Sequence, residues 1–181
     1  MRRAKVRFNY NDYLLLPEDK RYEILDGDLF VVAAPNIRHQ QICGNLFDAL
    51  LHHVRERDLG ELLFAPCDVI LSEEDVLQPD ILFVRKNHAS IIGKLNLRGA
   101  PDLIVEILSE GSRNRDLDLK RKLYARFGVQ EYWIVDPDVA SIEVLTWSEA
   151  GYVTAGSFGK SDRMSSPLLA ELRIPLAEIL A

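Results

Sequence analysis

Hydrophobic residues along the chain form short runs separated by polar segments, a pattern typical of a fold that mixes strands and helices. Residues 22–33, YEILDGDLFVVA, predict two short strands joined by an Asp-Gly turn. Residues 37–57 carry apolar side chains at helical spacing, and Asn36 before them is a suitable helix cap. The first third of the chain therefore predicts a hairpin followed by a helix.

The middle of the chain predicts strands, with one further helix. The strands are expected in ELLFA (61–65), CDVIL (67–71), DILFV (80–84), LIVEILS (103–109) and EYWIVDP (131–137). A helix is expected over residues 116–127, closed by Gly128 in a C-cap position. This order predicts the α/β class, with a central mixed sheet flanked by helices.

The last part of the chain has the pattern of an addition to that core. Residues 141–158 alternate around a turn and predict a peripheral hairpin. The tail from Leu172 predicts a short strand and a helical turn that begins at Pro175. We expect a single domain over residues 1–181, with its core at about 20–137 and a peripheral extension over 138–181.

Composition is that of an ordinary globular protein. The chain has 181 residues, of which 48% are hydrophobic and 28% charged, which argues against disorder. The N-terminus lacks the apolar stretch of a signal peptide, and no run approaches the roughly 20 apolar residues of a membrane span. Cys43 and Cys67 have no metal-ligand spacing. We expect a soluble, cytoplasmic protein without a membrane partner.

The net charge of −6 counts against a nucleic-acid partner, but the basic residues are unevenly distributed. They gather in residues 2–7, 85–98 and 113–126. Such clusters can form a local positive surface on an acidic protein, and they can equally be solvated loops and helix faces.

Glu106 is the most unusual residue of the predicted strands. It stands within LIVEILS, a run apolar enough on both faces to be covered on two sides. A carboxylate taken from water needs a partner. Asp102 lies on the same face of the strand but roughly 13 Å away, whereas Asp80 becomes a neighbour if DILFV pairs with LIVEILS in antiparallel fashion. Two such carboxylates repel each other, and a magnesium ion would turn the repulsion into binding.

Lys120 is the second unusual residue. On a helical wheel it falls near the middle of the apolar arc formed by Leu117, Leu119, Leu123, Tyr124 and Phe127. A lysine there is expected to contact a carboxylate or a bound anion. The alternative is an intrahelical pair with Asp116, with the lysine stem reaching back to water.

These motifs resemble those of the PD-(D/E)XK nuclease superfamily: Pro79-Asp80, a strand with Glu106-Ile107-Leu108, and then a helix. More closely, YEILDG, QPDILFV, PDLIVEILS and the series that ends in Glu131-Tyr132-Trp133 resemble the Uma-two family of restriction-endonuclease-like proteins. The similarity spans about residues 10–136. It implies a restriction-endonuclease-like core, Mg²⁺-dependent cleavage of phosphodiester bonds in DNA, with Mn²⁺ as an alternative ion, and homodimers.

The resemblance also implies roles for individual residues. Asp80 and Glu106 would hold the metal, with the Ile107 carbonyl as a further ligand. Glu23 would be an additional acidic residue of the catalytic site. The superfamily's lysine is missing two residues after Glu106, where Leu108 stands. Some related families take this lysine from the following helix, and Lys120 is then the catalytic candidate.

Several positions keep two interpretations. Arg113 and Arg115 are expected to bind substrate phosphates, or to be a solvated loop. Glu23 is equally compatible with a solvated strand edge. His39 and His53 are expected to be core histidines, with a supporting role at the site left open for His39. Leu108 stands where the superfamily has its lysine, so a second interpretation of the protein is kept. In that interpretation it is a catalytically inactive nucleic-acid-binding or dimeric interaction module with the same fold.

Overall fold

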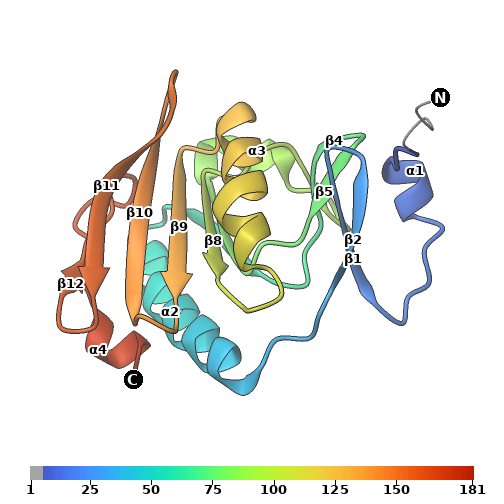
Figure 1. Ribbon diagram of the computed structural model, residues 1–181. Helices are drawn as coiled ribbons and strands as arrows, with labels where there is room; N and C mark the ends of the chain where they lie inside the picture. The colour runs from blue at the N-terminus through green and yellow to red at the C-terminus, as the bar shows by residue number, and fades with distance from the viewer. Residues whose placement is uncertain (1–5) are drawn as a thin grey trace.

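A six-stranded mixed sheet runs through the centre of the protein in the order β11-β10-β9-β8-β6-β3 (Figure 1). The computed structural model describes residues 6–181. Strands β8 and β9 are parallel, and the other neighbouring pairs are antiparallel. The strands are β3 (Gly60–Phe64), β6 (Ile81–Arg85), β8 (Leu103–Ile107), β9 (Glu131–Asp136), β10 (Ser141–Ser148) and β11 (Gly151–Gly159).

A second, five-stranded sheet lies beside the first in the order β2-β1-β5-β4-β7. It contains the predicted Asp-Gly hairpin, in which Asp26 and Gly27 take positive φ angles of 49° and 74°. Two positive φ angles in succession give the turn that best matches the twist of paired strands. The strands are β1 (Arg21–Leu25), β2 (Asp28–Val32), β4 (Val69–Ser72), β5 (Asp75–Leu77) and β7 (Leu97–Arg98).

Helices cover both faces of the central sheet. Helix α2 (Ile37–Glu56) begins at the predicted cap, where the Asn36 side chain accepts a hydrogen bond from the His39 N–H at 2.8 Å. Its apolar face packs on one side of the sheet, and α3 (Arg121–Arg126) packs on the other. The remaining short elements are α1 (Tyr10–Tyr13), η1 (Lys86–Ile91), β12 (Arg163–Met164), β13 (Ile174–Pro175) and α4 (Leu176–Ile179).

The C-terminal part of the chain joins both the sheet and the core. The predicted hairpin is β10–β11, and it extends the central sheet through the pairing of β10 with β9. Met164, Leu172 and Leu176 are buried in the same hydrophobic cluster as α2, each exposed by 2% or less. The tail that follows the hairpin therefore closes the core beneath α2.

The helix predicted over residues 116–127 has an unexpected first part. Residues Arg115–Lys120 (η2) form a π-helix, and α3 continues directly from it. Leu117 and Leu119, predicted to face the core, are 38% and 41% exposed. Hydrogen bonds from i to i+5 widen the turn and shift side chains around the axis, so a wheel drawn at 100° per residue is wrong here.

Some short elements were missed from the sequence, because their segments show little hydrophobic periodicity. Strands β5 and β7 and helix α1 were not predicted, because each spans four residues or fewer. The basic cluster of residues 2–7 lies mostly outside the described residues. Within residues 6–181, no helix is long and apolar enough to cross a membrane.

Candidate active site

Strand pairing places Asp80 next to Glu106, as predicted. Strands β6 and β8 are antiparallel, with Ile81 opposite Val105. Asp80 directly precedes the first of these residues and Glu106 directly follows the second, so the two carboxylates leave neighbouring strands at the same end. The Asp80 Oδ2 atom accepts a hydrogen bond from the Ile107 N–H at 2.8 Å.

Asp102 belongs to the opposite end of the same sheet. Its Oδ2 atom accepts a hydrogen bond from the Arg85 N–H at 2.8 Å and lies 3.1 Å from Nδ1 of His88. Asp102 therefore forms its hydrogen bonds away from Glu106, and Asp80 is the carboxylate that lies next to Glu106.

Lys120 is the partner that the buried Glu106 requires. Its Nζ atom lies 2.9 Å from Oε1 of Glu106, 3.0 Å from Oε1 of Glu23 and 3.3 Å from Oδ1 of Asp116. The Tyr124 hydroxyl donates a further hydrogen bond to Glu106 Oε1 at 2.6 Å. The intrahelical pair with Asp116 exists, but the lysine is only 4% exposed, and its ammonium group is held among three carboxylates.

Glu23 faces the site rather than solvent. Strand β1 lies between β2 and β5, so it is not a sheet edge, and Glu23 is 1% exposed. Besides contacting Lys120, its Oε1 accepts a hydrogen bond from the Gln78 N–H at 3.0 Å. The two sheets thus contribute one glutamate each to the same buried lysine.

Electrostatics at this cluster favour bound protons or cations. Burial raises the pKa of Glu106 well above its usual range, and Asp116, Asp80 and Glu23 raise it further, while Lys120 opposes the shift. Burial lowers the pKa of Lys120, but Glu106, Glu23 and Asp116 outweigh it and raise that pKa well above its usual value. The acids outnumber the lysine, so the site attracts positive charge.

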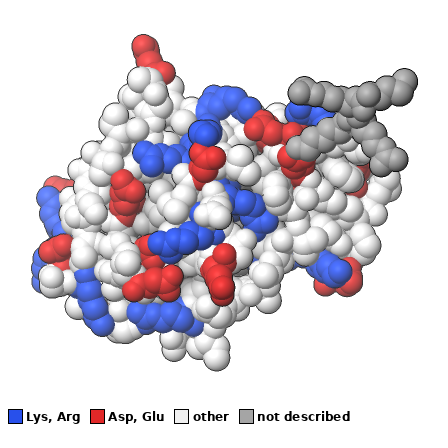
Figure 2. Space-filling model, viewed as in Figure 1, with Lys and Arg blue, Asp and Glu red and all other residues white. Residues whose placement is uncertain are grey.

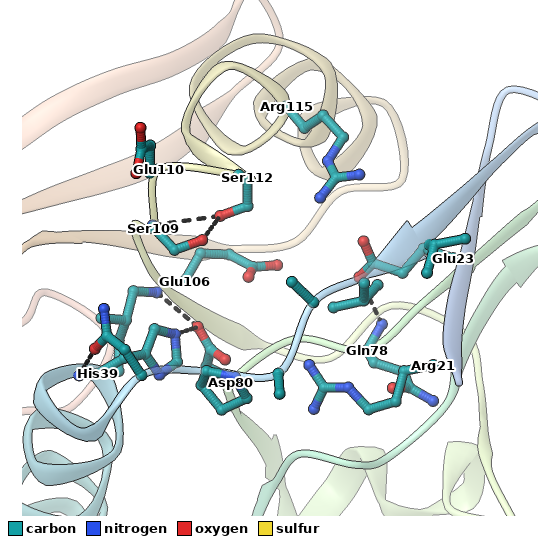
Figure 3. A pocket seen from close by; sticks show the side chains of 18 of the residues that line it. Arg21, Glu23, His39, Gln78, Asp80, Glu106, Ser109, Glu110, Ser112 and Arg115 are labelled. Atoms are coloured by element: carbon teal, nitrogen blue, oxygen red, sulfur yellow. Dashed lines mark hydrogen bonds and ion pairs between the residues drawn. The ribbon is translucent and has the colours of Figure 1, made fainter. Parts of the chain in front are cut away.

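These groups line an open cleft of about 380 Å³ (Figure 3). Asp80, Glu106, Glu23 and Lys120 form part of its wall. Figure 3 shows two further cations there: the Arg21 side chain reaches across from β1, and the Arg115 guanidinium points into the cavity from η2. Within residues 6–181 neither arginine forms a salt bridge, and the Arg115 guanidinium lies over the Phe30 ring, 5.1 Å from its centroid. The cleft therefore offers two available guanidinium groups beside the carboxylates.

Of the two arginines predicted to bind phosphate, only Arg115 faces the cleft. Arg113 forms ion pairs with Asp136 and Asp138, at the end of β9 and just beyond it. Its neighbours hold it away from the cleft lining, so its predicted role is not supported by its position.

Most of the basic cluster of residues 113–126 is similarly neutralised. Lys122 pairs with Asp118, and Arg126 pairs with Asp26 and Asp75. Figure 2 shows basic and acidic side chains mixed on the face that carries α3. The interpretation as a solvated helix face therefore fits Lys122 and Arg126, whereas Lys120 is buried and Arg115 lines the cleft.

His39 lies at the site, although its position on the apolar face of α2 predicted a core residue. Its Nε2 atom lies 3.2 Å from Oδ2 of Asp80, and its buried Nδ1 has no hydrogen-bond partner within residues 6–181. Burial lowers the pKa of His39, but the hydrogen bond and charge of Asp80 outweigh it and raise the pKa. The sequence left a supporting role open for His39 but gave no signal that it would contact Asp80. Arg21, which also lines the cleft, carried none.

His53, which was predicted to be a core histidine, and Trp133 are packed in the interior. His53 is 8% exposed, and its Nε2 has no hydrogen-bond partner among the described residues. Burial lowers its pKa. Trp133 is fully buried and donates a hydrogen bond from Nε1 to Oε1 of Glu131 at 2.6 Å.

The carboxylates at the cleft suit a hard divalent cation. The contacts of Glu106 all involve Oε1, and those of Asp80 all involve Oδ2, so each carboxylate keeps one oxygen without a partner among residues 6–181. No group of three or more His, Cys, Asp and Glu suited to a metal occurs in that range. Magnesium needs only one or two carboxylates and keeps several waters, so the two acids are a sufficient set.

A mixed sheet covered by helices, with acids and a lysine meeting at the end of paired strands, defines a restriction-endonuclease-like α/β protein. The chain belongs to the family described as "Uma2: Putative restriction endonuclease", whose model matches residues 10–177. It is also similar to a solved structure from Anabaena variabilis, described as "a putative nuclease belonging to DUF820". That similarity has a TM-score of 0.79 at 18% identity and covers 96% of this chain and 97% of the other, which confirms the predicted fold. Comparison with curated proteins gave no match.

Proposed function

We propose that this protein is a metal-dependent nuclease that hydrolyses phosphodiester bonds of DNA, with Mg²⁺ as its ion and Mn²⁺ as an alternative. The observation that carries the proposal is the position of Lys120. It contacts Glu106 and Glu23 at 2.9 and 3.0 Å, in a cleft that also contains Asp80. Family membership agrees with a nuclease.

Asp80 and Glu106 would hold the ion through the oxygens that make no other contact, with the Ile107 carbonyl as a further ligand. When bound, such an ion polarises the scissile phosphate and lowers the pKa of an attacking water. His39 keeps the Asp80 carboxylate in position through its contact with Oδ2.

The chain's own cations would act on the substrate. Lys120 stabilises negative charge that develops on the phosphate and orients the attacking water, while Glu23 keeps its ammonium in place. Arg21 and Arg115 bind the phosphates on either side, because guanidinium groups match phosphate oxygens in pairs. Arg21 takes the place that the sequence suggested for Arg113.

A catalytically silent nucleic-acid-binding module is the second candidate. Leu108 occupies the usual lysine position and is 5% exposed within a hydrophobic cluster. The Oε1 atom of Glu106 is already bound by Lys120 and Tyr124. A protein that had lost catalysis would keep this arrangement as a structural centre.

We also propose that the protein acts as a homodimer in the cytoplasm. Two related sites make it straightforward to cut both strands of a duplex. Light scattering at micromolar concentration tests this part, and a monomeric mass would contradict it.

The main experiment is a plasmid-nicking assay with and without Mg²⁺. The wild type is expected to nick supercoiled DNA only with the metal, and Glu106→Gln is expected to be inactive. Asp102→Asn is the matched control, because Asp102 is a buried carboxylate at the opposite end of the same sheet. Nuclease activity in Glu106→Gln would exclude the proposed site. A wild type that binds DNA but never cuts it would favour the silent module.

A further inference from the structure

A second hollow opens directly beside the cleft, between α2 and the end of β3. Its volume is about 290 Å³, and it shares Arg21, Pro35, His39 and Asp80 with the cleft. The rest of its lining is largely apolar. Cys43, Gly44, Phe47 and Phe64 contribute to it.

The hollow is attached to the candidate catalytic acid through the backbone. The Ala65 N–H donates a hydrogen bond to the Asp80 carbonyl at 3.0 Å, and Cys43 Sγ lies 4.0 Å from the same oxygen. Two residues of its wall, Ala65 and Cys43, are therefore next to the backbone carbonyl of Asp80. A group bound in the hollow would lie beside a phosphate bound in the cleft, because the two spaces share part of their lining.

An aromatic side chain stands exposed at this hollow. Phe64, the last residue of edge strand β3, is 56% exposed. Its ring packs edge-on against Phe47, with the centroids 4.7 Å apart and the planes at 67°. This contact orients the Phe64 ring, so that the aromatic surface it leaves open is held in place.

The chemistry of the cleft suits the phosphate of a nucleotide, and that of the neighbouring hollow suits the base. The cleft presents carboxylates for a metal and arginines for phosphate, whereas the hollow presents an aromatic ring and apolar walls. Arg21 lines both spaces. Bases that are not paired stack on exposed aromatic side chains, while the backbone lies along adjacent positive charge.

We propose that the hollow binds one unpaired nucleobase, stacked on Phe64, next to the phosphate held in the cleft. The bound base is then unpaired, in a single strand or flipped out of a duplex, since a base within a duplex cannot enter the hollow without leaving its stack. The location of the phosphate rests on the proposed function, but base binding itself does not require cleavage.

Gly44 offers a way to close the hollow without removing Phe64. A Cβ added at this helical position meets nothing within 4 Å. Gly44→Trp is therefore expected to fold and to fill the space, and Gly44→Ala is its matched control. Phe64→Ala removes the stacking surface, and Val153→Ala, at a 54% exposed position on β11, controls for loss of a surface hydrophobic group.

The experiment measures binding of a labelled single-stranded oligonucleotide in Ca²⁺, which replaces Mg²⁺ so that no cleavage is needed. Each base in turn is replaced by an abasic site. The wild type is expected to lose roughly 10-fold or more in affinity at one position, the scale of one base stacked on an aromatic ring. Phe64→Ala and Gly44→Trp should abolish that difference, while Gly44→Ala and Val153→Ala keep it. Thermal melting of each variant confirms that it is folded.

Equal affinity of the wild type for intact and abasic strands would overturn the proposal. Full discrimination in Phe64→Ala would do the same. If Phe64→Ala lowers the molecular mass measured in solution and leaves oligonucleotide affinity unchanged, this face is a contact between two copies of the chain, and the proposal is wrong. If the base effect is found but no Mg²⁺-dependent cleavage occurs, the nuclease proposal fails and the base site stands.

Discussion

Lys120 Nζ lies 2.9 Å from Oε1 of Glu106, although one residue comes from η2 and the other from β8. A lysine two residues after the glutamate would point to the same face of the strand. Leu108 stands there instead and packs in the core on that side. The helical segment after the strand supplies the ammonium group that contacts Glu106.

Replacing Lys120 is expected to affect both stability and turnover. Lys120→Ala leaves three carboxylates without their cation, and the unfolding free energy should fall by about 3–5 kcal/mol. Turnover, measured where the variant is still folded, should fall roughly 100-fold or more, the scale lost with a charge-stabilising donor. Metal affinity should not fall, because the lysine repels the ion. Urea unfolding, single-turnover cleavage and metal titration provide these measurements.

Lys122 is the matched control for Lys120. It lies two residues on, its side chain is 74% exposed, and within residues 6–181 its one salt-bridge partner is Asp118. Lys122→Ala should change the unfolding free energy by no more than about 0.5 kcal/mol and leave turnover unchanged. If the two alanine variants behaved alike, Lys120 would have no special role in the site.

Two substitutions of Asp80 are expected to separate its role in metal binding from its role in stability. Repulsion between the carboxylates suggests that removing one should stabilise the protein, but Asp80 also accepts the Ile107 N–H bond and contacts His39. Asp80→Ala should therefore lose about 1–3 kcal/mol of stability, because it leaves a buried N–H without an acceptor. Asp80→Asn keeps an acceptor oxygen and should retain most of the stability, yet lose Mg²⁺-dependent cleavage. Chemical denaturation and nicking assays on both variants test this, and an active Asp80→Asn would contradict it.

Most individual strands and the two hairpins could be predicted, because apolar runs and turn residues are local signals, but the order of the strands in the sheets was not predicted. Glu106 illustrates the strength of such a signal: a carboxylate within an apolar strand requires a partner whatever the fold. The pairing of Asp80 with it followed from antiparallel neighbours, and β6 and β8 have that arrangement. The role of each residue in catalysis remains a prediction.

Other features depend on contacts between segments that the chain pattern does not encode. The π-helix of η2 exposes Leu117 and Leu119, because its hydrogen bonds differ from those that the helical wheel assumes. His39 has the spacing of a core residue, and only the approach of β6 to α2 brings Asp80 to it. Arg113 is near the site in sequence, but Asp136 at the end of β9 holds it elsewhere.

His39 and His53 provide a test on one helix. Both are 8% exposed on the buried side of α2, but only His39 contacts Asp80. His39→Ala should weaken Mg²⁺ binding or turnover by roughly 10-fold, since partners that orient a metal ligand have effects of that order. His53→Ala should reduce thermal stability without changing either. Metal titration and cleavage rates at saturating Mg²⁺ distinguish the two, and an equal loss of activity in both would remove the positioning role of His39.

The raised pKa of Glu106 leads to a prediction about stability and pH. Burial, together with Asp116, Asp80 and Glu23, moves this pKa well above its ordinary value of 4.5 in the folded protein. Between the ordinary and the folded pKa the folded state binds more protons than the unfolded state, so stability falls as pH rises through that window. In the absence of metal, the unfolding free energy of the wild type should decline across this range.

Glu106→Gln cannot titrate, and its stability should vary less with pH over the same range. The difference between the two proteins isolates Glu106 from Asp116, whose pKa burial also raises. Mg²⁺ should reverse the trend in the wild type, because binding to a carboxylate requires loss of its proton and is favoured at higher pH. Urea unfolding at a series of pH values, with and without Mg²⁺, supplies the measurement. If the unfolding free energies of the wild type and Glu106→Gln vary with pH in parallel, Glu106 is already ionised in the folded protein over this range. Its pKa would then not be raised, and the prediction would be wrong.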